Sequence, residues 1–349
     1  MRISKGRILF FLVATILILW VVRRMDWTEV RQVLAGITPL QIGILLVLNV
    51  LIFLMFALRW WVFIRGSGGN IRFGSLARIR LTSFGITYFT PGPQIGGEPY
   101  QVYALSKNSG LPLDIAASSV SADKLTDLVA NFSFLVVSLG ILIAGGYLPR
   151  GIDLAVLPLA VIFLSIPLVY LALVRLGHKP VSAITSWVLS RIRTRGSLAR
   201  ISTGWRLRFE RWLRLQPHPD GSAGRVLPEL KDVEGNLHDL MREKPKVFFI
   251  GMGLAGVTWI FLIGEYHLAM GYLGLPLTWI QTIVLLTAAR LAFLLPSPSG
   301  LGTLEAGQVI AMQVLGFSPA AGIGISLLIR ARDVLFGGMG LLLAGKISR

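Results

Sequence analysis

The strongest constraint on this chain is a set of six apolar runs, most of them long enough to cross a lipid bilayer. A helix rises 1.5 Å per residue, so about 20 apolar residues span the hydrocarbon core. Backbone groups inside lipid must be bonded internally, and helices achieve this within one segment. We therefore expect an all-α membrane protein, a polytopic helical bundle of about six full spans. The runs cover residues 8–22, 40–64, 115–146, 153–174, 246–270 and 318–345.

Two further apolar segments are interrupted by glycine and proline. The first covers residues 81–111 and the second covers residues 278–316. About ten apolar residues on either side of the first break give half-helices of roughly 15 Å, too short for two crossings. We expect each segment to be a re-entrant hairpin. For residues 278–316, two short full spans are the alternative.

The two halves of the chain repeat a series of motifs about 205 residues apart. All matches occur in the same order, at offsets between 205 and 207 residues. Duplicated and Gly/Pro-broken segments in a membrane chain point to a transporter-like binding site. The matched pairs are Leu81/Leu286, Pro91/Pro296, Gly96/Gly302, Glu98/Glu305, Lys124/Arg330 and Asp127/Asp333.

The basic residues predict which side of the membrane each loop occupies. The net charge is +17, and residues 175–246 hold 15 Lys and Arg against 7 Asp and Glu. Basic loops stay in the cytoplasm, and no nucleic-acid-binding motif accompanies this charge. The resulting path puts both termini in the cytoplasm, assigns the chain to the cytoplasmic (inner) membrane and makes the halves inverted repeats. The expected parts are a first transmembrane half (1–174), a basic cytoplasmic interfacial segment (175–245) and a second transmembrane half (246–349).

Four charged residues at membrane depth are the first candidates for a site. Lys124 and Arg330 lie eleven and twelve residues into their helices, roughly 17 Å deep, and Asp127 and Asp333 follow each of them at i+3. One interpretation is that each acid neutralises the neighbouring base and stabilises the bundle. The other is that the two cations face a central cavity and hold an anionic headgroup, with the acids orienting them.

Two glutamates and four glycines at the hairpin breaks complete the candidate set. Glu98 and Glu305 fall in the first turn of a half-helix, where a carboxylate caps free amides. They are expected either to cap and to pair with Lys124 and Arg330, or to take a direct part in transport. The glycines allow close backbone approach, and free amides at a helix start bind phosphate. These glycines are Gly96, Gly97, Gly300 and Gly302.

Other residues point away from chemistry at this site. Arg59, beside two tryptophans, is interpreted as an interfacial anchor, and Glu265 as a residue lining an exit. Cysteine is absent, and the four histidines lack metal-ligand spacing. There is no hydrolase, phosphate-loop or metalloprotease motif. We therefore expect no enzymatic activity, no cofactor and no metal.

The hairpins and the helices after them resemble the family of lysylphosphatidylglycerol synthase transmembrane-region proteins, often described as flippase-like. The resemblance covers roughly residues 8–345. It implies translocation or presentation of phospholipids, polyprenyl-linked sugars or hopanoid-type lipids, without the aminoacyl-transferase activity of the full synthases. Two residues depart from the family pattern, because Gln101 and Lys124 stand where arginine is common, which weakens bidentate phosphate recognition. The matching motifs are residues 90–99, 121–127, 295–305 and Arg330.

The sequence is therefore compatible with three functions. The leading one is a transporter for an anionic lipid, whose headgroup sits at the midplane against Lys124 and Arg330. The second is a non-transporting membrane partner of a lipid-modifying enzyme, recruited through the segment 175–245. The third is an intramembrane enzyme that acts on lipid headgroups, with Glu98 and Glu305 as acid and base.

Overall fold

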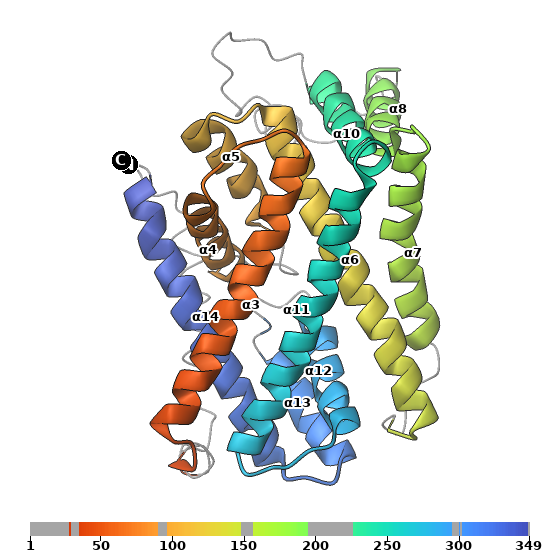
Figure 1. Ribbon diagram of the computed structural model, residues 1–349. Coiled ribbons are helices and arrows are strands. Elements are labelled where there is room, and N and C mark those ends of the chain that lie inside the picture. Colours follow the sequence, from red (N-terminus) through yellow and green to blue (C-terminus); the bar gives the residue numbers. More distant parts are fainter. Residues whose placement is uncertain are drawn as a thin grey trace.

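The computed structural model describes residues 28, 35–89, 96–147, 156–194, 226–294, 300 and 302–347. Helices make up the regular structure of this part of the chain (Figure 1). Four are long and apolar enough to cross a membrane, which confirms the all-α membrane fold and four of the expected spans. They are α3 (Pro39–Gly66), α6 (Leu113–Ala144), α7 (Val156–Arg175) and α11 (Pro245–Tyr272).

The other two expected spans have different outcomes. The run 8–22 lies outside the described residues. The run 318–345 forms α14 (Pro319–Ile347), whose 29 residues are enough to cross. However, α14 carries Arg330, Arg332 and Asp333 close together, so it is not uniformly apolar.

Each broken segment contains two helices. The first holds α4 (Phe73–Phe89) and α5 (Glu98–Ser109), and the second holds α12 (Trp279–Leu294) and α13 (Thr303–Val314). At 17 and 16 residues, α4 and α12 extend about 25 Å. They exceed the expected ten-residue half-helices but fall short of the roughly 30 Å core. Helix α4 begins at Phe73, eight residues before the broken segment 81–111, so Arg78 and Arg80 are helical. Pro91, Pro93, Pro296 and Pro298 lie outside the described residues, whereas Pro99 lies in the first turn of α5.

The repeat extends to the lengths and order of the helices. Helices α3 and α11 have 28 residues each, and α5 and α13 have 12 each. Helices α6 and α14 have 32 and 29. Figure 1 shows that α3 and α11 run in opposite directions, as do α6 and α14. The α4–α5 hairpin lies in the upper half of that view, and the α12–α13 hairpin in the lower half.

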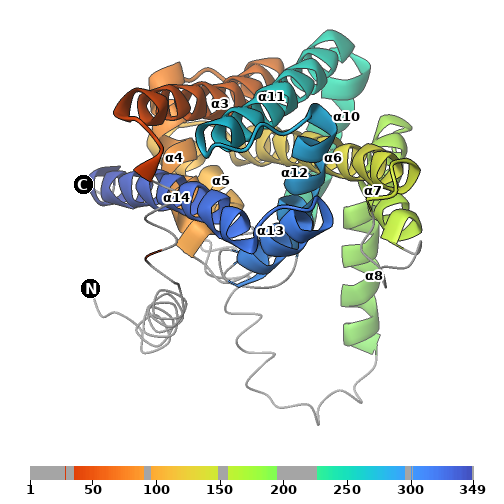
Figure 2. The same cartoon turned by 90° about the horizontal axis from the view of Figure 1, so that it is seen from below.

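The two sets of helices meet through equivalent contacts. Helix α3 packs against its counterpart α11, side by side in Figure 2. Helix α4 packs against α14, and its counterpart α12 packs against α6. The α4–α14 contact is unusually close, because a Cβ atom added at Gly340 would overlap the backbone of Leu81, and one at Gly85 would meet the carbonyl of Gly337.

The helices α7, α8 (Pro180–Thr194) and α10 (Val226–Arg242) lie between the two sets in sequence. In α10, Leu237, Leu240 and Met241 are buried in a cluster with residues of α3 and α6. Helix α10 therefore packs against the bundle, because its apolar residues recur at i, i+3 and i+4. Glu234 of α10 accepts hydrogen bonds from the backbone N–H of Val181 (2.9 Å) and Ser182 (3.1 Å), which caps α8.

Candidate functional site

The first-half candidates form an ion pair at the start of α5. The Nζ atom of Lys124 on α6 lies 2.7 Å from Oε1 of Glu98. The other oxygen of Glu98 accepts a hydrogen bond from the backbone N–H of Gly96 at 3.0 Å. The Lys124 side chain is 33% exposed and that of Glu98 is 23% exposed. Gly97 is buried at the helix start, where a Cβ atom would overlap Ser83 and Thr87 of α4.

The second-half candidates form the matching pair at the start of α13. Arg330 on α14 donates to both carboxylate oxygens of Glu305, and the Nη2–Oε2 distance is 2.9 Å. Oε2 of Glu305 also accepts from the backbone N–H of Gly302 at 2.9 Å. Arg330 further donates to the carbonyl of Gly300 at 3.0 Å. Gly300 and Gly302 both adopt positive φ angles, 67° and 79°, which glycine accommodates without steric cost.

The two halves thus repeat one arrangement. In each, a glutamate caps a glycine amide at the hairpin break and binds the cation of the following long helix. Arg330 makes two contacts with its glutamate because guanidinium is a planar fork, whereas an ammonium is a point charge. The Arg330–Glu305 pair is also less exposed, at 13% and 14%. Tyr88 of α4 hydrogen-bonds to Arg330, so this pair touches both halves.

Asp127 and Asp333 lie against arginines. Oδ1 of Asp127 is 3.3 Å from Nη2 of Arg59 on α3. Oδ1 of Asp333 is 2.9 Å from Nε of its neighbour Arg332. The acid that follows Lys124 therefore reaches α3, whereas the acid that follows Arg330 contacts its own helix.

A buried cluster around Asp123 was not predicted from the sequence. Its Oδ1 is 2.7 Å from Nε of Arg59, and its Oδ2 is 2.5 Å from Nη1 of Arg80 on α4. The Arg59 side chain is only 1% exposed, so its interpretation as an interfacial anchor is wrong. Arg59 instead joins α3 to α6, because it binds the carboxylate of Asp123 on α6.

A second such cluster surrounds Arg332. Its Nη1 lies 2.8 Å from Oε1 of Glu265 on α11 and 3.3 Å from Oδ1 of Asn49 on α3. Glu265, expected to line an exit, therefore binds a cation that also contacts the first half through Asn49. Arg332 was not predicted. The sequence did carry a signal for it, because Arg332 is a charged residue in an apolar run. It lies two residues after Arg330 and therefore on the opposite face of α14.

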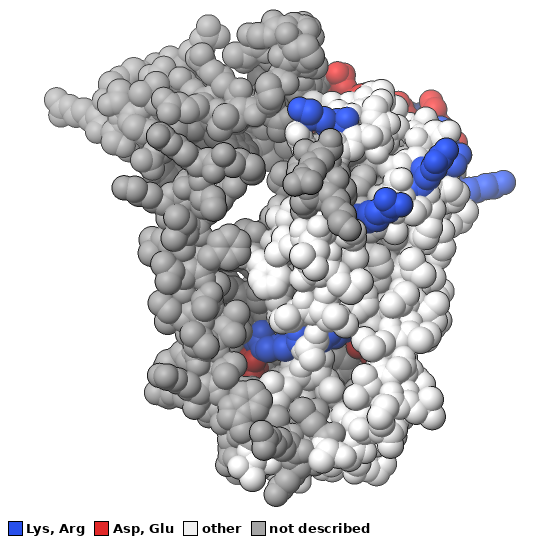
Figure 3. Space-filling view, turned by 90° about the vertical axis from the view of Figure 1, so that its left-hand side faces the viewer, with Lys and Arg blue, Asp and Glu red and all other residues white. Residues whose placement is uncertain are grey.

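Figure 3 shows how these charges appear on one side of the molecule. Lys and Arg gather with Asp and Glu at one end and in a single deep cluster. Uncharged residues, drawn in white, border that cluster on the described part of this face. A charge at membrane depth costs at least a few kcal/mol, so a function is its default interpretation.

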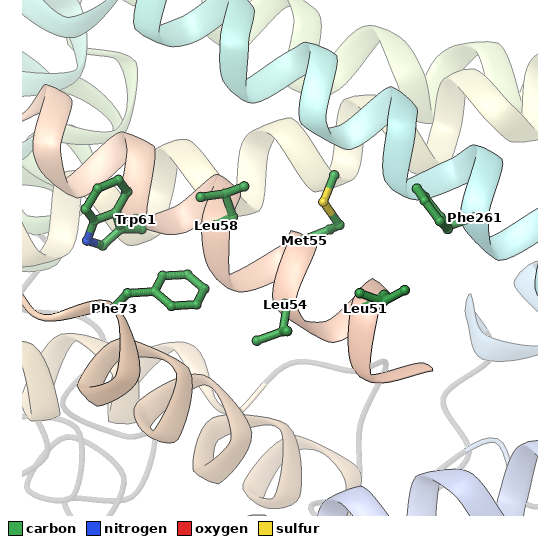
Figure 4. A pocket seen from close by; sticks show the side chains of 7 residues that line it. All are labelled: Leu51, Leu54, Met55, Leu58, Trp61, Phe73 and Phe261. Carbon is green, nitrogen blue, oxygen red and sulfur yellow. The ribbon is translucent and has the colours of Figure 1, made fainter. Parts of the chain in front are cut away.

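An apolar groove lies apart from these charges, on the outer side of α3. Its volume is about 460 Å³, and it opens between α3, α4 and α11 (Figure 4). None of the predicted site residues lines it. Its walls are Leu51, Leu54, Met55, Leu58, Trp61, Phe73 and Phe261.

The comparisons agree with this architecture. Residues 7–339 match the family described as the lysylphosphatidylglycerol synthase TM region. A UPF0104 membrane protein of Methanothermobacter thermautotrophicus is 24% identical over 293 residues, which are 84% of this chain and 80% of the relative. Another, from Methanocaldococcus jannaschii, is 20% identical over 334 residues, or 94% and 90% of the two chains. The chain is a multi-pass membrane protein and belongs to the family of the lysylphosphatidylglycerol synthase transmembrane region.

Proposed function

We propose that this protein moves a phosphate-bearing lipid across the cytoplasmic membrane through a charged site between two inverted halves. The observation that carries the proposal is the matched pair of ion pairs, Glu98–Lys124 and Glu305–Arg330, one at each hairpin break. Inverted repeats with interrupted helices at a site between them are typical of alternating-access transporters. The opposite directions of α3 and α11 in Figure 1 support the inversion.

The side of each hairpin follows from the basic residues. Arg65 at the end of α3, Arg72 before α4 and Lys244 before α11 lie at the same end of the bundle, the upper end in Figure 1. Because such residues stay inside, this end is cytoplasmic. The α4–α5 hairpin then enters from the cytoplasm, the α12–α13 hairpin from outside, and α14 ends on the cytoplasmic side. We propose the same side for the N-terminus because its sequence carries Arg2, Lys5 and Arg7.

The ion pairs explain how a charged site persists without a ligand. A lone cation at this depth is costly, whereas a paired cation is neutralised. A lipid phosphate that displaces Glu98 from Lys124, or Glu305 from Arg330, keeps the cation neutralised. The Lys124 pair is the more exposed, so we expect it to exchange first. The acyl chains stay in the surrounding lipid throughout.

The test is leaflet exchange in proteoliposomes. Purified protein is reconstituted with a fluorescent phospholipid or a polyprenyl phosphate, and exchange is followed by quenching of the outer leaflet. We expect exchange with the native chain and its loss in Lys124→Ala/Arg330→Ala. Lys107→Ala is the matched control, because Lys107 is an exposed lysine on α5 that contacts the Tyr103 ring, and it should exchange normally.

Two results would overturn the proposal. One is unchanged exchange in the double variant, which would remove the charged site from the path. The other is no exchange of any tested lipid by folded native protein. That second result would favour a non-transporting partner of a lipid-modifying enzyme.

A further inference from the structure

Arg290 on α12 is held differently from the other cations of the charged site. Its guanidinium carbon lies 4.6 Å from the centroid of the Trp259 ring on α11. Trp259 in turn stacks on Phe134 of α6, with centroids 4.3 Å apart and ring planes inclined by 19°. The stack therefore combines a cation and a ring from the second half with a ring from the first half.

The stack lies at the middle of the membrane. Trp259 is 14 residues from Pro245 and 13 from Tyr272, the two ends of α11. At 1.5 Å per residue, this is about 20 Å from either end, near the midplane of a bilayer spanned by that helix. An ionisable group at this depth carries the largest desolvation cost that a membrane imposes.

The other cations of the charged clusters described above have carboxylate partners. Arg59, Arg80, Lys124, Arg330 and Arg332 each lie within ion-pair distance of Asp or Glu. For Arg290, the part of the chain that the structure describes provides neither an ion pair nor a hydrogen bond, and Trp259 is its recorded contact.

The surrounding charges also come from both halves. Asp127 of α6, Glu265 of α11 and Arg332 of α14 are near enough to act on Arg290 through their electric fields. Arg290 is neither fully buried nor exposed. A cation–π contact with an indole uses none of the N–H donors of the guanidinium. Those donors form a planar fork that matches the oxygen atoms of a phosphate.

We infer that Arg290, stacked on Trp259, binds the phosphate of the lipid headgroup at the midpoint of its path. The inference rests on the proposed transport function and deepens it. A phosphate reaches Lys124 or Arg330 only by displacing a glutamate, whereas binding to Arg290 breaks no ion pair. The headgroup would therefore rest on Arg290 between successive exchanges with the two hairpin pairs.

The first experiment measures binding to the full chain in detergent. Calorimetric titration with dihexanoyl-phosphatidylglycerol compares the native chain with Arg290→Gln. We expect the affinity to fall by about ten- to a hundred-fold, the usual effect of losing charge-assisted hydrogen bonds. Dihexanoylglycerol, which lacks the phosphate, should bind weakly to both proteins. Equal affinity of native protein and Arg290→Gln for the phosphatidylglycerol would overturn the inference.

A second arm separates a lipid headgroup from a free anion. Inorganic phosphate and glycerol 3-phosphate are titrated in the same way. Weaker binding of both than of the short-chain lipid supports a lipid site. If inorganic phosphate binds as tightly as the lipid and depends on Arg290, the site serves a free anion and the lipid assignment fails.

A third measurement excludes a purely structural role. Arg290→Met removes a cation to which the described residues offer no carboxylate partner, so the melting temperature of the ligand-free protein should rise while phosphate binding is lost. Arg332→Met is the matched control. Because it leaves Glu265 and Asp333 without their cation, it should lower the melting temperature. A fall in the melting temperature with Arg290→Met, with binding preserved, would make Arg290 structural.

These readouts keep the two proposals distinct. Lipid exchange at the native rate in Arg290→Gln, together with its loss in Lys124→Ala/Arg330→Ala, would overturn the role of Arg290 alone. If the native chain exchanges no lipid, the transport proposal fails, while the titrations still decide whether Arg290 binds phosphate.

Discussion

The buried carboxylate of Asp123 gives the sharpest stability prediction. Both of its oxygens accept from arginines, Nε of Arg59 at 2.7 Å and Nη1 of Arg80 at 2.5 Å. Asp123→Asn keeps the shape but removes the charge and replaces one acceptor by an NH₂ donor. That donor must face an arginine N–H, so at least one hydrogen bond is lost outright.

The expected cost follows from these contacts. A hydrogen bond to a charged group contributes about 1.5–3 kcal/mol, and breaking a buried ion pair costs about 3–5 kcal/mol. Asp127 compensates Arg59 only partly, because its oxygen is 3.3 Å away and its side chain is 39% exposed. We therefore expect Asp123→Asn to lower the free energy of unfolding by about 3–5 kcal/mol.

The assay is reversible unfolding in mixed micelles with increasing dodecyl sulfate, followed by circular dichroism. Asp123→Asn/Arg80→Gln is the matched control, because it removes the arginine that the substitution leaves unpaired. The double variant should recover about half of the loss, a coupling that a double-mutant cycle measures. A loss below about 1 kcal/mol in Asp123→Asn would refute the reasoning, since a buried carboxylate between two arginines cannot be neutralised so cheaply.

The remaining predictions concern the repeat, the helix contacts and α8. Glu305→Gln should destabilise the protein by about 1 kcal/mol more than Glu98→Gln in the same unfolding assay, because its pair is bidentate and less exposed. Gly340→Ala should cost about 1–3 kcal/mol by overlap with α4, whereas Gly338→Ala, with open space around it, should change stability by less than about 0.5 kcal/mol. Glu234→Gln should weaken the cap of α8 and speed hydrogen exchange of its first amides by about ten-fold, measured by mass spectrometry.

The long helices could be predicted closely because the bilayer fixes their length. The apolar run 40–64 corresponds to α3, and the run 246–270 to α11, each within two residues at either end. The start of helix α4 was predicted less well, because the apolar pattern begins at residue 81 whereas the helix begins at Phe73. Its first turns contain Arg78 and Arg80, and hydropathy assigns such residues to a loop although helix propensity does not oppose them.

The candidate site was predictable where the chain repeats itself. The match of Glu98 with Glu305, and of Lys124 with Arg330, placed four residues that the structure brings into two pairs. Arg59 had no such signal, because its partner Asp123 lies 64 residues away on another helix. Periodicity within one helix reports which face is apolar, but not which distant helix supplies a counter-charge.

The contrast between the two contacts that join the halves has a mechanical consequence. Helices α4 and α14 meet nearly backbone to backbone at Gly85 and Gly340, whereas α6 and α12 meet through larger side chains, among them Leu291. A joint made of glycines tolerates rotation about itself but not separation, since any gap would forfeit its close atomic contacts. Side chains, by contrast, can change rotamer to follow a moving partner. Relative motion of the halves should therefore pivot at α4–α14 and reach its largest amplitude across α6–α12, beside the aromatic stack.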